Sequence, residues 1–297
     1  MKEKLIDAGF ALGWSAVRKL PESAARSLFD AGGGIAWRRQ GHGVQVLEGN
    51  LTRVFPDADG AEIRDLSRQT LRSYARYYCE TFRLHDIPAE RLDAELTVNR
   101  DQVDKALQYM KDGRGVIFAL PHMGDFEQAG AWVVHYGAGS LTTVAERLKP
   151  ESVYERYVKF RESLGMEVLP LTGGPASFGI LAQRLRAGKL VCLVTDRDLS
   201  NNGVEVKFFG EAAKMSGGSA ALAAATGAAL MPVGCWFEGE TGWGIHVYDE
   251  IPVPESGDRR EKVAAMTQSM ATAFEDAIRE HPTDWHMLQR VFLKDLG

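Results

Sequence analysis

The sequence is poor in cysteine and has no long apolar run. Its three cysteines, Cys79, Cys192 and Cys235, stand in apolar surroundings and form no C-x-x-C pair. Isolated thiols of this kind are typical of small core side chains in a reducing compartment. No stretch of about 18 uncharged apolar residues is present, and the N-terminus lacks the apolar core and cleavage site of a signal peptide. We therefore expect neither disulfides nor a membrane-spanning helix.

Several motifs of common enzyme classes are also missing. There is no G-x-G-x-x-G and no Walker loop, which argues against a dinucleotide enzyme and a P-loop enzyme. The order around Ser177 is not G-x-S-x-G, which argues against a covalent serine hydrolase. The net charge of −5 does not favour nucleic acid as a partner.

The pattern of apolar residues changes near residue 115. Before it, helical spacing dominates, with helices expected over residues 61–83 and 101–111. After it, expected strands cover residues 116–120, 141–145, 167–171, 190–195, 230–237 and 244–249, and expected helices cover 126–136, 152–164, 177–187, 219–226 and 259–280. This alternation predicts an α/β fold with a mostly parallel central sheet flanked by helices. We expect a single domain over 1–297, with a mainly helical extension in 1–110 and the α/β core in 111–297.

An apolar stripe marks the N-terminal segment. Leu5, Ile6, Phe10, Trp14 and Val17 recur at helical spacing, and basic side chains lie off the stripe. An amphipathic helix of this kind can lie in a membrane interface and meet anionic lipid. The alternative is that the same stripe packs against the protein core.

The most informative segment is the apolar run 116–120 with the residues that follow it. His122 and Glu127 come just after this expected strand, in the order H-x4-E. Ligands of open α/β sheets bind beyond the carboxyl ends of the strands. We therefore expect His122 to act as a general base, with Glu127 holding its ring, although a histidine after a strand can also be a structural hydrogen-bonding residue.

A second group of ionisable residues follows the expected strand 190–195. Asp196, Arg197 and Asp198 come directly after it, so the same edge of the sheet should collect more charge. The D-x-D order also resembles the metal-binding dyad of nucleotide-sugar glycosyltransferases. A structural ion pair of Arg197 with a neighbouring acid is the alternative.

Two further segments are of interest for ligand binding. Glu146 follows the expected strand 141–145, and cations including Arg161 come soon after it; they could contact phosphates or form a solvated helix face. The helix 219–226 has a glycine-rich start that could receive an anion or a developing oxyanion, or could simply allow tight helix packing.

Taken together, these motifs resemble the lysophospholipid/lipid A acyltransferase superfamily, which is defined by H-x4-D/E. His122 and Glu127 match the two motif positions, and Asn50-Leu51-Thr52-Arg53-Val54-Phe55-Pro56 is similar to an early block of the lipid A branch. Asp196-x-Asp198 and Phe208-Phe209-Gly210 match later blocks. The segments 144–151, 160–165 and 196–200 most resemble the actinobacterial branch that acylates phosphatidylinositol mannosides. This resemblance implies a glycerophosphate-acyltransferase-like fold.

The resemblance also implies the reaction. A long, palmitoyl-type acyl chain would pass from acyl-CoA, a co-substrate, to a mannose hydroxyl of the glycolipid, with no permanently bound cofactor and no metal. The enzyme would be peripheral, held at the cytoplasmic face of the plasma membrane through its N-terminal amphipathic segment. The catalytic residues expected are His122, Glu127 and Asp196, with Asp196 near the acceptor hydroxyl. The residues expected to bind substrate are Glu146, Arg161, Arg197, Asp198 and Phe126.

We expect the acyl chain to occupy a narrow apolar tunnel lined by the helix 126–136 and the apolar strands. Three alternatives remain at this point. One is a lipid A-type acyltransferase, which differs in its acceptor. A second is a metal-dependent glycosyltransferase using Asp196 and Asp198. A third is a non-enzymatic membrane-surface protein.

Overall fold

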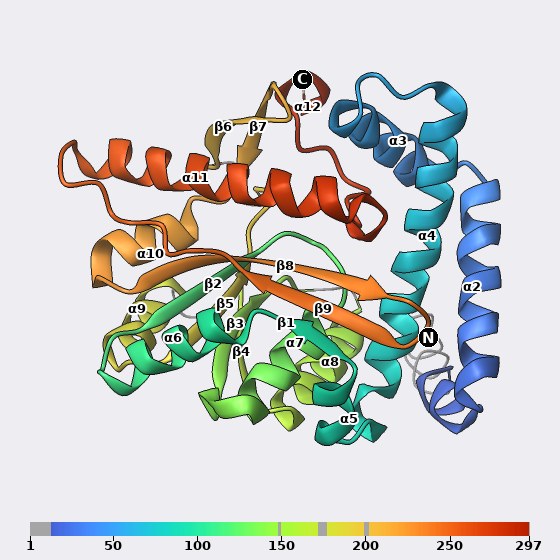
Figure 1. Cartoon of the computed structure of the whole chain (residues 1–297), viewed down its shortest axis with the longest axis horizontal. Coiled ribbons are helices and arrows are strands. Elements are labelled where there is room, and N and C mark those ends of the chain that lie inside the picture. The colour runs from blue at the N-terminus through green and yellow to red at the C-terminus, as the bar shows by residue number, and fades with distance from the viewer. Residues whose placement is uncertain (1–12, 148–149, 172–176, 199–201, 297) are drawn as a thin grey trace.

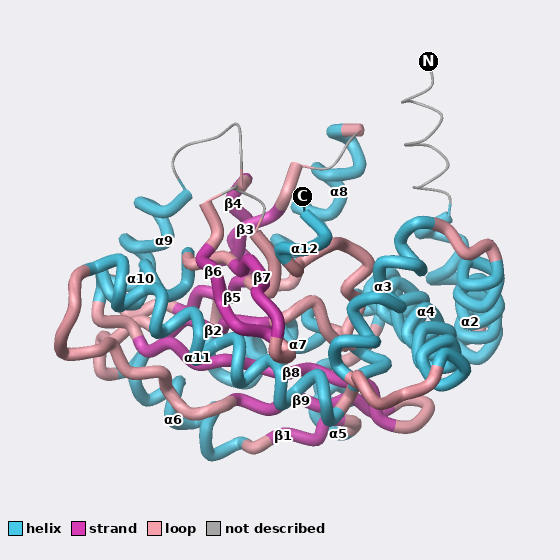
Figure 2. The backbone as a smooth tube through the Cα atoms, turned by 90° about the horizontal axis from the view of Figure 1, so that it is seen from above, coloured by secondary structure: helices cyan, strands magenta, loops and turns pink. Residues whose placement is uncertain are grey.

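The computed structural model describes residues 13–147, 150–171, 177–198 and 202–296. Its N-terminal part is a layer of helices, α2 (Glu22–Arg38), α3 (His42–Val54) and α4 (Gly60–Arg83). Helix α4 starts at a capping box, in which the Asp59 side chain accepts from the backbone N–H of Glu62 and the Glu62 side chain accepts from that of Asp59. The layer stands beside the sheet and not on either of its faces (Figures 1 and 2).

The core of the molecule is a seven-stranded sheet in the order β1-β9-β8-β2-β5-β3-β4. Its strands are β1 (Leu96–Val98), β2 (Val116–Leu120), β3 (Leu141–Ala145), β4 (Met166–Pro170), β5 (Leu190–Val194), β8 (Ala229–Glu238) and β9 (Gly242–Val247). All neighbouring pairs are parallel except the β8–β9 hairpin. The predicted α/β fold with a mostly parallel sheet flanked by helices is confirmed.

Helices cover both faces of this sheet. One face packs against α9 (Ser177–Arg186), α10 (Gly218–Thr226) and α11 (Arg259–Glu280), and the other against α6 (Arg100–Lys111), α7 (Phe126–Val133) and α8 (Glu151–Ser163). Strand β2 contributes side chains to both cores, because successive side chains of a strand point to opposite faces of the sheet. Ile117 and Ala119 join the first core, and Phe118 and Leu120 join the second.

Some elements differ from those predicted. The sheet already begins with β1, within the first 110 residues, and a separate antiparallel ribbon forms from β6 (Val204–Phe208) and β7 (Glu211–Met215). Helix α7 ends at Val133 and continues as a π-helical turn over Val134–Ala138. The remaining short elements are Leu84–Asp86, α5 (Ala89–Ala94), Pro282–Asp284 and α12 (Leu293–Leu296).

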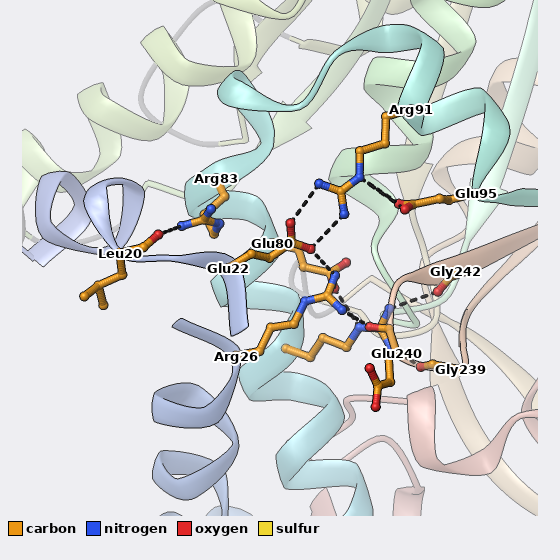
Figure 3. Close-up of polar contacts among 11 residues, drawn as sticks. Leu20, Glu22, Arg26, Glu80, Arg83, Arg91, Glu95, Gly239, Glu240 and Gly242 are labelled. Carbon is orange, nitrogen blue, oxygen red and sulfur yellow. Dashed lines mark hydrogen bonds and ion pairs between the residues drawn. The ribbon is translucent and has the colours of Figure 1, made fainter. Parts of the chain in front are cut away.

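A network of ion pairs and hydrogen bonds around the buried Glu80 connects the helical layer to the sheet (Figure 3). Glu80 of α4, which is 4% exposed, pairs with Arg26 of α2 at 3.3 Å and with Arg76 at 2.7 Å. Arg76 also donates to the carbonyls of Gly239 and Gly242 at 2.8 and 2.9 Å. Because these carbonyls belong to the β8–β9 turn, the network ties α2 and α4 to one end of the hairpin.

The described part of the N-terminal stripe packs against the core. The Trp14 indole donates to the Phe82 carbonyl at 2.9 Å, and its ring lies 5.3 Å from that of Phe160. Val17 is buried as well. For these two residues the docking alternative therefore holds, whereas Leu5, Ile6 and Phe10 lie outside the described residues. Within the described ranges, no helix is both long enough and apolar enough to span a membrane.

Candidate active site

Three neighbouring parallel strands deliver the candidate residues to one edge of the sheet. Strand β5 lies between β2 and β3, and His122, Asp196 and Glu146 follow the ends of β2, β5 and β3. Leu120 of β2 is paired in register with Val194 of β5. His122 and Asp196 are each two residues beyond that pair, so the sheet itself brings them side by side.

His122 is bound to Asp196 through both its ring and its backbone. Its Nδ1 lies 2.6 Å from Asp196 Oδ1, and its backbone N–H donates to Asp196 Oδ2 at 2.9 Å. The His122 side chain is 27% exposed and that of Asp196 is 0% exposed. When Nδ1–H donates to the carboxylate, Nε2 is the nitrogen that can accept a proton. The pair therefore has the geometry of a general base with an orienting carboxylate.

The surroundings of Asp196 favour its ionised form. Burial by itself would raise the pKa of this carboxyl group. The charge of His122, the two hydrogen bonds from His122 and one from the Trp285 indole together outweigh burial and lower the pKa of Asp196 below its ordinary value. Asp196 can therefore stabilise a protonated imidazole.

Glu127 has a different partner. Both of its carboxylate oxygens accept from Arg161 Nε at 3.0 Å, and a second nitrogen of the guanidinium also contacts Oε1. The Tyr77 hydroxyl donates to Oε1 at 3.4 Å. The expectation that Glu127 holds the His122 ring is thus wrong, since Asp196 holds it. Glu127 lies in the first turn of α7, which directs its side chain toward α8 and α4. Asp196 is likewise not a free second carboxylate beside the acceptor, because it is fully buried behind His122.

Arg161 is less buried than its partner, but most of its side chain is covered. Its side chain is 18% exposed and that of Glu127 is 2% exposed. Burial by itself would lower the pKa of Arg161, but the charge and hydrogen bonds of Glu127 raise it overall. Arg161 therefore keeps its charge beside Glu127.

An open cleft lies in front of His122. Its walls come from α4, α7, α8, α9, α10 and the ends of β3 and β5, and include Tyr77, Tyr78, Phe126, Ala145, Glu146, Tyr154, Tyr157, Arg161, Phe178, Thr195, Arg197, Asp198, Ser216 and Gly218. All five residues expected to bind substrate, Glu146, Arg161, Arg197, Asp198 and Phe126, line this cleft. The start of α10 reaches it too, through Ser216 and Gly218.

The two carboxylates of the D-x-D sequence do not converge. Asp196 is engaged by His122, whereas Asp198 accepts from the backbone N–H of Gly203 at 2.8 Å. Arg197 lies 3.5 Å from Glu146, which is 54% exposed, so this is a weak rim contact. Within the described ranges, no group of three or more His, Cys, Asp or Glu residues is placed to hold a metal ion. This geometry does not support the glycosyltransferase interpretation.

A narrow apolar cavity adjoins the cleft. The cavity is narrow, with a volume of about 80 Å³. Phe126, Val144, Arg161 and Val194 line both the cavity and the cleft. Deeper residues, among them Val103, Trp132, Val133, Met166, Ile245 and Val247, line the cavity alone. Its position between α7 and the apolar strands is that of the predicted tunnel.

The C-terminal segment contributes to the site in a way the sequence did not predict. The indole of Trp285 donates to Asp196 Oδ2 at 3.0 Å. His286 is buried, and burial together with the nearby charge of His122 lowers the pKa of its ring to about 3. These residues are 89 positions or more away from Asp196 in sequence, so no local spacing reveals them; the tryptophan that follows Pro282-Thr283-Asp284 was the available signal.

Comparison with known proteins places the chain in a family. The family model described as "Bacterial lipid A biosynthesis acyltransferase" matches residues 4–294. The chain belongs to this family. The resemblance predicted from the H-x4-E motif is therefore confirmed, and the protein is an acyltransferase of the lipid A biosynthesis acyltransferase family.

Two relatives in this acyltransferase family resemble the chain over nearly its full length. The phosphatidylinositol mannoside acyltransferase of Mycolicibacterium smegmatis is 48% identical over 297 residues, which cover 99% of this chain and 93% of the relative. The protein of the same name from Mycobacterium tuberculosis (strain H37Rv) is 47% identical over 292 residues, which cover 98% of this chain and 90% of the relative.

Proposed function

We propose that this acyltransferase moves a long, palmitoyl-type acyl chain from acyl-CoA to a mannose hydroxyl of phosphatidylinositol mannosides, with His122 as general base. The observation that carries the proposal is the His122–Asp196 pair at the wall of a cleft that adjoins an apolar cavity. The names of the two mycobacterial relatives support the acceptor. Acyl-CoA enters as a co-substrate, and no permanently bound cofactor takes part.

The reaction needs one base and one good leaving group. A sugar hydroxyl is a poor nucleophile at neutral pH, so its proton must be removed as the new C–O bond forms. His122 Nε2 takes that proton while the oxygen attacks the thioester carbonyl. The tetrahedral intermediate then expels the CoA thiolate, which takes the proton from the imidazolium and leaves as the thiol. Asp196 stabilises the imidazolium between these two transfers.

The apolar cavity is the proposed site of the acyl chain. Each buried methylene contributes about 0.8 kcal/mol, so a long chain gains most of its binding energy by leaving water. The cavity begins at Phe126 and Arg161 beside the cleft, which puts the thioester near His122 when the chain is inserted. Its narrow bore suits a single methylene chain.

The open cleft is the proposed site of the glycolipid headgroup. Tyrosines from α4 and α8 form one wall and can pack against sugar rings, while the rim residues Glu146, Arg197 and Asp198 offer charged and hydrogen-bonding groups. The guanidinium of Arg197 is suited to the acceptor phosphate. The start of α10 offers backbone amides to the developing oxyanion or to a phosphate.

We also propose that the enzyme works as a peripheral protein at the cytoplasmic face of the plasma membrane. A surface depression beside α8 is lined by the basic residues Arg18, Lys19, His85, Arg156 and Lys159 and by the acidic residue Asp86. Such a cationic surface attracts anionic phospholipid headgroups. Flotation with anionic and zwitterionic vesicles tests this: the wild type should float with anionic vesicles only, and Lys19→Glu/Lys159→Glu should lose that binding. Equal flotation of the two proteins would contradict the proposal.

The proposed reaction is tested with radiolabelled palmitoyl-CoA and phosphatidylinositol mannosides. His122→Ala should lose at least about a hundredfold in transfer, as the loss of a general base does. The matched control is His246→Ala, which removes an exposed imidazole on β9 and should transfer at the wild-type rate. A His122→Ala variant as active as wild type would overturn the mechanism.

Two further arms test the acceptor and the alternatives. Transfer to a Kdo-lipid acceptor but not to mannolipid would replace the proposed acceptor by a lipid A-type one. Loss of activity in EDTA would revive the metal-dependent interpretation, whereas the general-base mechanism predicts that activity survives chelation.

A further inference from the structure

Two backbone hydrogen bonds connect the C-terminal segment to the loop that carries His122. The backbone N–H of Gly124 donates to the Asp284 carbonyl at 2.9 Å, and that of His286 donates to the His122 carbonyl at 2.8 Å. Gly124 has φ +56°, and a Cβ there would lie 2.5 Å from the Cys235 backbone, so glycine is required at this close approach. Trp285 therefore lies between two residues, Asp284 and His286, whose backbones are held by these hydrogen bonds.

Packing fixes the position of the Trp285 side chain as well. The residue is fully buried. Its ring meets Phe208 edge to face at 5.9 Å and lies 6.1 Å from Phe209. Because this packing fixes the ring, the indole N–H of Trp285 is fixed as well, and it donates to Asp196 Oδ2 at 3.0 Å.

Asp196 needs such a fixed donor because the torsion of a carboxylate group is broad. Its Oδ2 accepts from two donors, the Trp285 indole and the His122 backbone N–H. With that oxygen occupied on two sides, Oδ1 is left aimed at His122 Nδ1. We propose that Trp285 is a positioning residue, whose indole N–H holds the Asp196 carboxylate so that it orients the His122 ring toward the cleft. This inference rests on the proposed role of His122 as general base.

The decisive variant is Trp285→Phe, which keeps a large aromatic ring and removes only the donor. We expect kcat to fall about tenfold, with the KM values of donor and acceptor within about twofold of wild type, because the loss of one hydrogen bond to a charged group is of this size. The acid limb of the pH–rate profile should move to higher pH, because a carboxylate with one donor fewer holds the imidazolium more strongly.

Two comparisons separate positioning from a general loss of packing. Trp243→Phe is the matched control, since Trp243 is also fully buried and its indole donates to the side-chain oxygen of Gln128 at 3.1 Å. It should keep the wild-type profile. In an Asp196→Asn background, Trp285→Phe should have little further effect, because coupled residues are not additive. A full tenfold loss in that background, or an unchanged profile in Trp285→Phe, would overturn the proposal.

A measurement on the wild-type protein covers the case in which Trp285→Phe does not fold. The Nε1–H resonance of Trp285 should titrate together with the His122 ring and should shift in Asp196→Asn. A resonance that stays constant in both tests would show that the indole does not sense the pair. This readout needs no substrate, so it stands even if the proposed acceptor or base is wrong, and His122→Ala tests those separately.

Discussion

Two pairs of an acidic and a basic side chain lie near the cleft, and they differ in what they can do. In one, Asp196 holds His122, and in the other, Glu127 holds Arg161. Histidine changes its protonation state near neutral pH, whereas the guanidinium of arginine stays charged. Only the first pair can therefore move a proton. The second holds a fixed charge where the cleft meets the apolar cavity.

The two pairs also arise from different parts of the fold. His122 and Asp196 come from equivalent positions beyond two paired parallel strands. Glu127 and Arg161 come from the helices α7 and α8, which cover one face of the sheet. Two residues close together in a motif can therefore serve separate tasks. In this molecule the histidine of H-x4-E carries the proposed chemistry, and the glutamate positions an arginine.

The largest effect on activity is expected from Asp196→Asn, which alters the first of the two pairs. An asparagine amide can donate to Nδ1, which would put the ring proton on Nε2 and leave no base facing the cleft. We expect kcat to fall about ten-thousandfold, the effect of replacing the orienting aspartate of a catalytic triad by asparagine. Steady-state kinetics on the folded variant measures this, with Asp30→Asn as control because Asp30 only forms an exposed ion pair with Arg72. Loss of less than about tenfold would show that Asp196 does not support the base.

The next effect is on stability and comes from Glu127→Gln. Removing one partner of a buried pair leaves Arg161 charged and uncompensated, which costs about 3–5 kcal/mol. Thermal or denaturant unfolding measures this loss, and Glu127→Gln/Arg161→Met should regain part of it. The acid limb of the pH–rate profile should stay where it is in wild type. A shifted limb without loss of stability would mean that Glu127, and not Asp196, serves the ring in the working enzyme.

Much of the fold could be predicted because its central strands are apolar and largely buried. Runs such as 116–120 and 190–194 are apolar throughout, which is the signature of a parallel sheet covered on both faces. Strand β1 has only three residues, and the β6–β7 ribbon alternates buried and exposed side chains outside the main sheet. Three residues are too few to show a period, whereas the alternation over Val204–Phe208 is a sequence signal from which the ribbon could be predicted.

The sequence predicted which residues lie near the cleft better than it predicted the contacts between them. His122, Glu146, Arg197 and Asp198 lie around one cleft because the parallel strands that they follow end at the same edge of the sheet. Which carboxylate holds the ring depends on the register between β2 and β5, and no spacing along the chain reports that register. For the same reason the contact of Trp285 with Asp196 emerges only from the folded structure.

The smallest expected effect concerns the cavity at which the Glu127–Arg161 pair is placed. Val247 lines its deep part and is 1% exposed, so Val247→Phe should shorten the chain that fits. At about 0.8 kcal/mol per methylene, the preference should shift about tenfold toward a donor two carbons shorter. Competition between acyl-CoA donors measures this.

The position of the substitution along the cavity makes this prediction specific. Val144→Phe, where the cavity meets the cleft, should slow donors of every length alike, because every chain passes that point. Val191→Phe overpacks the opposite core by the same change and should cost about 1–3 kcal/mol of stability while leaving the preference for chain length unaltered. If Val247→Phe behaved like either of these two variants, the acyl chain would have to lie elsewhere. The fixed charge of Arg161 would then mark the floor of the headgroup cleft and not the entrance to a lipid tunnel.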